Sequence, residues 1–161
     1  MRSFVSHTKA SGFTLIELVI VIVLLGILSA MALPRLGDFI GTTKEDTTKR
    51  ELQLIKRAIV GDPEVTIGGQ LADKGYYGDT GHLPDNLDAL VTKPASDSSW
   101  NRYSQSGWNG PYMDTGGSDS WKKDAWGNPY VMDKPNEEIY SLGPNKQDDG
   151  GSGDDIVISL F

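Results

Sequence analysis

The chain has 161 residues, with 15 basic and 22 acidic side chains, a net charge of −7 and no cysteine. This length accommodates one globular domain with an appendage, and not two full domains. The acidic balance argues against nucleic acid as a partner, because phosphate binding needs basic patches, and the lack of cysteine excludes disulfides.

The first predicted element is an apolar helix over 13–33, interrupted only by the polar residues Thr14, Glu17 and Ser29. At 1.5 Å per residue it would span about 31 Å, which matches the hydrocarbon core of a bilayer. Arg2 and Lys9 precede the helix, whereas 13 basic and 21 acidic residues follow it. Basic residues keep a flank in the cytoplasm, so we predict a single-pass inner-membrane protein whose N-terminus is cytoplasmic before processing.

The N-terminus differs from an ordinary secretory signal, because the apolar run is too long and no small-residue cleavage site closes it. Composition alone leaves an uncleaved signal anchor open. The junction Lys9-Ala10-Ser11-Gly12-Phe13-Thr14-Leu15-Ile16-Glu17 resembles the class III leader of type IV pilins and pseudopilins. The resemblance implies that a prepilin peptidase removes residues 1–12 by cutting after Gly12, and methylates the new N-terminal Phe13.

Glu17 is the carboxylate inside the predicted membrane helix, where a charge costs on the order of 3 kcal/mol. One interpretation places it near the lipid headgroups, where it stays hydrated. The other pairs it with the α-amine that cleavage creates at Phe13 of a neighbouring subunit, so that two buried charges neutralise each other. The resemblance implies the second interpretation.

The helix is predicted to continue to about Val60. Gly26 and Pro34 lie within it, and they indicate either a kink near residues 30–34 or a segment that can be extended. Residues 34–60 form an amphipathic continuation that packs on a domain, and Gly61-Asp62-Pro63 ends it. The predicted packing face holds Leu36, Phe39, Ile40, Thr43, Thr47, Leu52, Ile55 and Ile59.

Residues 61–161 are rich in Gly and Pro with short apolar runs, which predicts a small antiparallel sheet with long loops. The fold class is therefore α+β, a long N-terminal helix packed on that sheet. A hairpin edge is expected at 64–67 followed by Gly68-Gly69, and a short helix at 84–91. Strands are expected at 129–132, 139–142 and 156–160.

Three motifs in this domain look like those of major pseudopilins of type II secretion systems. They are Leu83-Pro84 with the following 87–94 segment, Trp108-Asn109-Gly110-Pro111-Tyr112, and Asp124-Ala125-Trp126-Gly127-Asn128-Pro129-Tyr130. Ala125 departs from the proline usual in the family. The resemblance is weak over 61–79, and the lack of cysteine is unlike typical type IV pilins with a C-terminal disulfide.

An acidic loop follows Tyr140-Ser141-Leu142-Gly143 and contains Asp148-Asp149-Gly150-Gly151-Ser152-Gly153-Asp154-Asp155. Taken alone, such a stretch is either a solvated loop or an oxygen-rich Ca²⁺ site. The similar loop in major pseudopilins binds calcium. By resemblance the ligands are Asp154, Asp155, the Leu142 carbonyl and Asn145. The family often has Asp at the position of Asn145, so the amide lowers the negative charge of the site. Asp148 or Asp149 would compensate for the missing charge.

Other residue patterns indicate no enzyme. His7 and His82 are too few for a histidine-based metal site, and no nucleophile with a base is present. The four tryptophans could line a sugar site, although packing in the small domain is the favoured interpretation. They are Trp100, Trp108, Trp121 and Trp126.

The sequence therefore predicts a structural filament subunit of the major pseudopilin class, which does no chemistry itself. The resemblance implies self-association into a periplasmic pseudopilus that helps export folded proteins. It also implies a prepilin peptidase, minor pseudopilins, an inner-membrane platform protein and an assembly ATPase as partners. The alternatives are a type IV pilin of a surface fibre used for adhesion, motility or DNA uptake, and an anchored periplasmic enzyme or binding protein.

Overall fold

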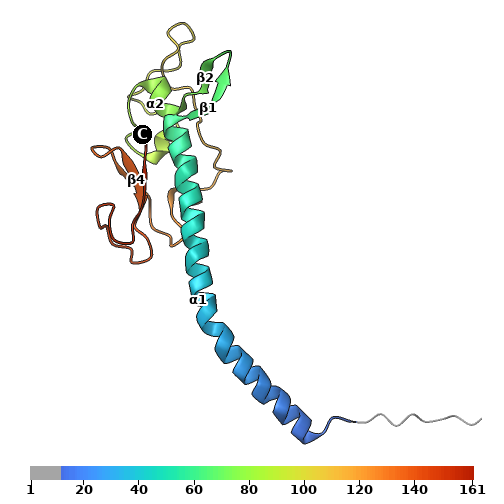
Figure 1. Cartoon of the computed structure of the whole chain (residues 1–161). Coiled ribbons are helices and arrows are strands. Elements are labelled where there is room, and N and C mark those ends of the chain that lie inside the picture. Colours follow the sequence, from blue (N-terminus) through green and yellow to red (C-terminus); the bar gives the residue numbers. More distant parts are fainter. Residues whose placement is uncertain (1–11) are drawn as a thin grey trace, which may run out of the picture. The chain divides into compact units, whose positions relative to one another are not determined.

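The computed structural model describes residues 12–161, apart from the side chains at 31–38, 70 and 71. It divides into two compact units whose boundary follows Gly41. The described part of the first unit is the beginning of helix α1, which runs from Leu15 to Val60 (Figure 1). The predicted leader, residues 1–12, lies outside the described residues except for Gly12.

Helix α1 is unbroken at Gly26 and Pro34, so neither residue interrupts the secondary structure. It ends as the sequence predicts. Gly61 has a φ of +81° and its N–H donates to the Arg57 carbonyl at 2.7 Å. A residue with positive φ directly after a helix satisfies a terminal carbonyl, and glycine adopts this conformation without strain.

The buried face of α1 begins later than predicted. Phe39 and Ile40 are 70% and 50% exposed, and Thr47 is exposed as well. The packing face starts instead at Thr48, whose Oγ1 accepts a hydrogen bond from the Ala125 N–H at 3.2 Å. Its buried members are Thr48, Leu52, Ile55, Ala58 and Ile59. This is the spacing of one helical face.

The core of the domain joins this face to residues from every later part of the chain. Burial of an aliphatic side chain contributes about 1.5–3 kcal/mol, so these contacts fix the helix on the sheet. The buried apolar residues that join α1 in the core include Tyr76, Ala89, Leu90, Tyr130, Ile139 and Leu160.

The predicted hairpin is confirmed and is longer than expected. Strand β1 (Asp62–Ile67) pairs antiparallel with β2 (Gln70–Asp73). Gly68 and Gly69 form the two-residue turn with φ values of +61° and +80°. Two consecutive positive φ values are what a tight hairpin turn of this kind requires.

One helical prediction was wrong, and one short helix was not predicted. The segment 84–91 forms only the 3₁₀ helix η1 (Leu87–Leu90), because Asn86 is extended with φ −155° and ψ 168°. A short helix α2 (Gly75–Thr80) was not predicted, since its sequence GYYGDT is poor in helix-forming residues. A second 3₁₀ turn, η2, spans Ser120–Lys122.

The main sheet has three antiparallel strands in the order β3-β4-β5, with bounds Val131–Asp133, Glu138–Ser141 and Ile156–Ser159. All three were predicted within two residues. Strand β3 starts later than expected because Tyr130 donates its N–H to the Lys122 carbonyl at 3.0 Å instead of joining β4. The long connection between β4 and β5 is the acidic loop.

Candidate functional site

The start of α1 carries the predicted processing and assembly residues, Gly12, Phe13 and Glu17. Thr14 and Glu17 cap the helix reciprocally. The Glu17 N–H donates to Thr14 Oγ1 at 3.3 Å, and the Thr14 N–H donates to Glu17 Oε2 at 3.5 Å. This is a capping box, whose signal is Thr with Glu three residues later. Glu17 therefore has a structural role that the sequence analysis did not consider.

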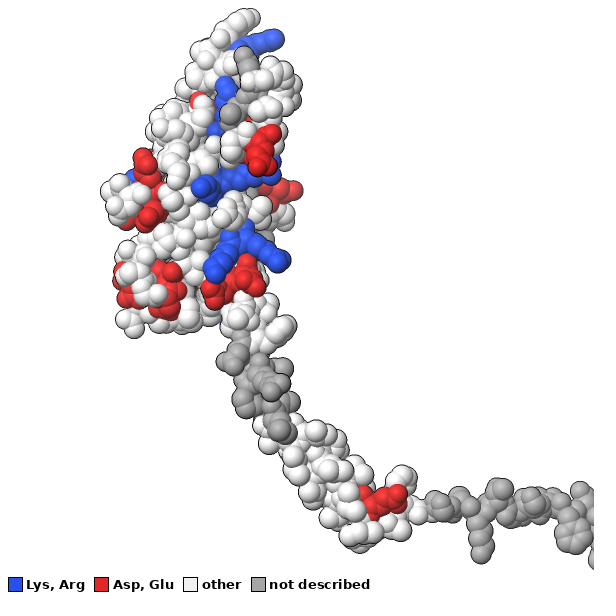
Figure 2. All heavy atoms as spheres, in the orientation of Figure 1, with Lys and Arg blue, Asp and Glu red and all other residues white. Residues whose placement is uncertain are grey.

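The following part of α1 presents apolar side chains on every side. All residues from Gly12 to Ala30 are exposed, with Phe13 at 84% and Leu28 at 63%. In Figure 2 this stretch is white apart from one acidic side chain near its start. A helix that is apolar all round is buried in its working state. In the described part of the chain, no helix is long and apolar enough to cross a membrane.

The acidic loop is held in place by the motif that begins at Asp124. The buried Asp124 carboxylate accepts hydrogen bonds from the Trp126 and Asn128 N–H groups at 2.9 and 2.8 Å, and from the Ser141 hydroxyl. Asn128 Nδ2 donates to Asp124 Oδ2 and also to the Gly143 carbonyl, both at 3.0 Å. The motif thus fixes the residue at which the acidic loop leaves β4.

Within the loop, Asn145 lies between two carboxylates. Its Nδ2 donates to Asp149 Oδ2 at 3.1 Å and, over a shorter distance, to Asp154 Oδ1. Its N–H donates to Asp154 Oδ2 at 3.0 Å. An N–H donor between two negative charges stabilises them, and a cation would be favoured at the same place.

Asp155 is partly satisfied by the backbone of the loop. Its Oδ2 accepts the N–H groups of Asp149 and Gly151 at 3.1 and 3.0 Å. Its Oδ1 is buried and has no hydrogen-bond partner among the described residues. A buried carboxylate oxygen without a partner is costly, and a metal ion is one of the few groups that would satisfy it.

Of the predicted metal ligands, Asn145, Asp154 and Asp155 lie together in this loop, which starts from half-buried Leu142. Asp148 instead accepts the Tyr140 hydroxyl at 3.0 Å, and Asp149 takes its place beside Asn145. Within the described residues, no group of three or more His, Cys, Asp or Glu is arranged to hold a metal. A site here would depend on amide and carbonyl oxygens as well as carboxylates, a donor set that suits Ca²⁺.

The four tryptophans lie in three different environments. Trp108 and Trp121 pack against the core, as the favoured interpretation expected, and Trp108 Nε1 donates to the Ala89 carbonyl at 2.8 Å. Trp126 is half-buried in the turn of the Asp124 motif. Trp100 lines a surface cavity.

Two family models match different parts of the chain. The family described as type II secretion system (T2SS), protein G matches residues 67–160, and the prokaryotic N-terminal methylation motif matches residues 7–33. Type II secretion system core protein G of Vibrio cholerae is 31% identical, over 92% of this chain and 90% of that protein. The Pseudomonas aeruginosa protein of the same name is 31% identical, over 93% and 94%.

A second kind of relative is similar over a shorter stretch. Type IV major pilin protein PilE1 of Neisseria gonorrhoeae is 37% identical over 56% of this chain and 36% of that protein. No solved structure matches the chain.

Proposed function

Because this chain belongs to the family of type II secretion system protein G, we propose that it is the major pseudopilin of such a system. It is a structural subunit that polymerises into a periplasmic pseudopilus, and the filament drives export of folded proteins. The observation that carries the proposal is the apolar surface around α1 from Phe13 to Leu28, directly after the junction at Gly12. Copies of the same helix would cover this surface in a filament.

We propose further that Glu17 compensates charge between subunits. Removal of residues 1–12 would leave an α-amine at Phe13, four residues before Glu17 in the same chain and close to Glu17 of a staggered neighbour. Pairing the amine with the carboxylate would remove two unpaired charges from an apolar bundle and would fix the register of the helices. The capping box supports this placement, because it holds the carboxylate at the first turn.

The subunit is a cell-envelope protein, and its finer placement is part of the proposal. The apolar stretch 13–33 would cross the inner membrane once before assembly, with residues 61–161 in the periplasm. A prepilin peptidase would cut after Gly12. Minor pseudopilins, a platform protein and a cytoplasmic ATPase would act in assembly, and the subunit would have no enzymatic role and no nucleic-acid partner.

Calcium binding by the acidic loop is also a proposal. Asp154, Asp155 and Asn145 would hold the ion with backbone carbonyls, including that of Leu142, while Asp149 or Asp148 supplies further charge. The unpartnered Oδ1 of Asp155 supports it. When bound, Ca²⁺ would neutralise the loop and hold β4 and β5 together at their loop ends.

A surface type IV pilin is the second candidate function. The similarity to PilE1 favours it, but that similarity covers 56% of this chain, against more than 90% for the two protein G relatives. The pseudopilin function is therefore the better supported of the two.

The proposal is tested with three versions of the full chain in a host that carries the secretion machinery: wild type, Glu17→Gln and Glu17→Leu. Gln retains the capping box and removes the charge, whereas Leu removes both. Electron microscopy of cell-envelope extracts from cells that overproduce each version should show filaments for the wild type and few for either variant. If Glu17→Gln forms filaments and Glu17→Leu does not, Glu17 acts in helix capping alone. An absence of filaments from the wild type would overturn the proposed pseudopilin function.

A further inference from the structure

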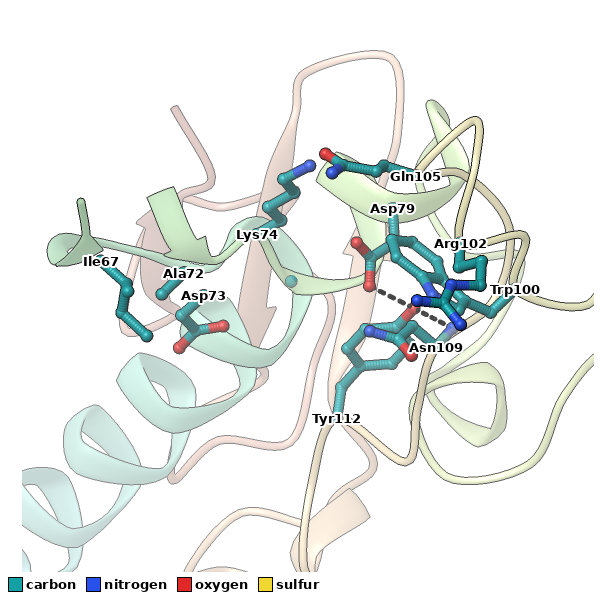
Figure 3. A pocket seen from close by; sticks show the side chains of 11 residues that line it. Ile67, Ala72, Asp73, Lys74, Asp79, Trp100, Arg102, Gln105, Asn109 and Tyr112 are labelled. Atoms are coloured by element: carbon teal, nitrogen blue, oxygen red, sulfur yellow. Dashed lines mark hydrogen bonds between the residues drawn. The ribbon is translucent and has the colours of Figure 1, made fainter. Parts of the chain in front are cut away.

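A polar cavity of about 610 Å³ lies between the β1–β2 hairpin, α2 and the 98–112 segment (Figure 3). This volume is in the range of small-ligand sites. The side chains that matter below come from two regions. Lys74 and Asp79 lie at α2, the first just before it and the second within it, and Trp100, Arg102, Gln105 and Asn109 belong to the long segment. Figure 3 shows Lys74 and Gln105 pointing toward one another, with Arg102 on the other side of Asp79, beside Trp100 and Asn109.

The walls of this cavity are held by close backbone contacts. A Cβ on Gly75, at the start of α2, would lie 2.3 Å from the Gly61 nitrogen. The Gly107 N–H donates to the Asp79 carbonyl at 2.8 Å, which joins the long segment to α2. The cavity is therefore formed before any ligand arrives, and binding would cost little ordering of the backbone.

Asp79 supplies a buried acceptor at the cavity. The residue is 6% exposed, and its Oδ2 accepts the Tyr112 hydroxyl at 3.1 Å. The same hydroxyl accepts the Asn109 N–H at 2.8 Å, so its position is fixed by two hydrogen bonds. Burial raises the pKa of the Asp79 carboxyl, against the opposing effect of the Tyr112 hydrogen bond. The Asn109 side chain also forms a hydrogen bond with Asp79 and likewise opposes the rise in its pKa. A carboxylate has about four lone-pair sites, so a hydroxyl of a ligand can add a further hydrogen bond.

Two cations, Lys74 and Arg102, line the same cavity, and the charge of Lys74 opposes the rise that burial causes in the pKa of the Asp79 carboxyl. Neither Lys74 nor Arg102 forms an ion pair within the part of the chain that the structure describes. The Arg102 guanidinium lies over the Tyr103 ring, 5.8 Å from its centroid. Asp73, which also lines the cavity, is paired with Arg57 at 3.1 Å. Arg102 is thus available to an anionic group, and Lys74 adds a positive charge that it shares with Asp79.

We propose that this cavity binds a saccharide that carries a carboxylate. Ring hydroxyls would donate to Asp79 and bond the amides of Gln105 and Asn109, the apolar face of a sugar ring would lie on Trp100, and the acid group would lie at Arg102 and Lys74. Each side chain is matched to one feature of such a ligand. The assignment goes beyond the filament role, and it depends on residues that take no part in α1.

The test is calorimetric titration of the full chain in a detergent without a sugar headgroup. The probes are digalacturonic acid and the neutral disaccharide cellobiose. Each is titrated into wild type, Arg102→Gln, Trp100→Ala and the control Arg50→Gln, which removes an exposed arginine from α1 outside the cavity.

We expect the acidic disaccharide to bind the wild type at least tenfold more tightly than the neutral one. Arg102→Gln should abolish that preference, and Trp100→Ala should lower the affinity for both sugars. Arg50→Gln should bind both sugars as the wild type does. The proposal would be overturned if neither sugar bound the wild type. It would also be overturned if Arg102→Gln and Trp100→Ala left the binding unchanged. Equal binding of both sugars to the wild type would overturn the assignment of the acid group. Filaments made by Arg102→Gln would leave the pseudopilin function standing in each case.

Discussion

The hydroxyl of Tyr130 donates a hydrogen bond of 2.6 Å to Oε2 of Glu51, and so joins the segment before β3 to helix α1. Tyr130 is 7% exposed and lies in the apolar core. The contact links residues 79 positions apart, across the surface on which the helix packs. A hydrogen bond to a charged acceptor in such a place stabilises the fold more than an exposed one.

Tyr130→Phe should therefore lower the free energy of unfolding by about 1.5–3 kcal/mol, because the change removes a charge-assisted bond and leaves the Glu51 carboxylate short of a donor. Urea denaturation of a fragment beginning at Thr42, the start of the second compact unit, would measure it. The control is Tyr103→Phe, since Tyr103 is 92% exposed. Equal stability of the two variants would show that the Glu51 contact contributes nothing.

Alkaline pH should unfold the domain over a window set by its tyrosines. Burial raises the pKa of Tyr140 to about 12, with the Asp148 hydrogen bond adding to it, and burial likewise raises the pKa of Tyr130 and Tyr112. Above pH 10 the unfolded chain loses these protons while the folded one keeps them, so stability falls as pH rises from about 10 to 12. Melting curves at pH 8–12 should show this, and Tyr140→Phe should make the fall shallower.

A glycine contact at the end of α1 gives a matched pair of variants. Gly75 has a φ of +62°, and a Cβ there would lie 2.3 Å from the Gly61 nitrogen and 2.7 Å from the Ile59 carbonyl oxygen. Gly81 has a φ of +82° with nothing within 4 Å of the same position. Both changes to Ala incur backbone strain of about 1–2 kcal/mol, and Gly75→Ala should cost at least about 2 kcal/mol more through overpacking. Denaturation midpoints that coincide would refute the contact.

Calcium should raise the melting temperature of the same fragment, by an amount equivalent to about 2.7 kcal/mol at a hundredfold excess over Kd. Mg²⁺ should substitute poorly, because it requires a tighter octahedral shell. The paired Asp154→Ala and Asp155→Ala changes should abolish the calcium-specific shift. A melting temperature that is the same in chelator and in Ca²⁺ would leave the loop as a solvated acidic turn.

Asn145→Asp adds a test whose sign depends on the ion. In chelator it removes the Nδ2 donor from between Asp149 and Asp154 and adds a third negative charge, so the fragment should become less stable. With Ca²⁺ the extra carboxylate should instead enlarge the stabilisation beyond that of the wild type. A variant that is destabilised equally in both conditions would exclude an ion beside Asn145.

Processing is checked by intact-mass measurement of the membrane-extracted protein. The mass should correspond to loss of residues 1–12 and addition of one methyl group at Phe13. A bulky residue at Gly12 should leave the precursor uncut, because the peptidase must accommodate that side chain at the scissile bond. Recovery of the full-length wild-type chain from a host with an active peptidase would contradict the predicted junction.

The sequence by itself determined the features that local chemistry dictates. The apolar run over 18–28 made the first half of α1 apolar on every side, and Gly61 ended the helix. Gly68-Gly69 formed the hairpin turn, because few other residues adopt two positive φ values. The capping box was also present as Thr14 with Glu17, although it was overlooked.

Tertiary structure decided what depends on residues distant along the chain. The packing face of α1 begins at Thr48, where the Ala125 N–H donates to the Thr48 hydroxyl. Asp149 lies beside Asn145, whereas Asp148 accepts a hydrogen bond from Tyr140. The composition of the loop does not distinguish these two neighbouring carboxylates, and only its folded conformation does. Likewise the cavity at Asp79 gathers Lys74 and Arg102 from separate segments, and no spacing in the sequence reveals such a site because its members meet only after the core has formed.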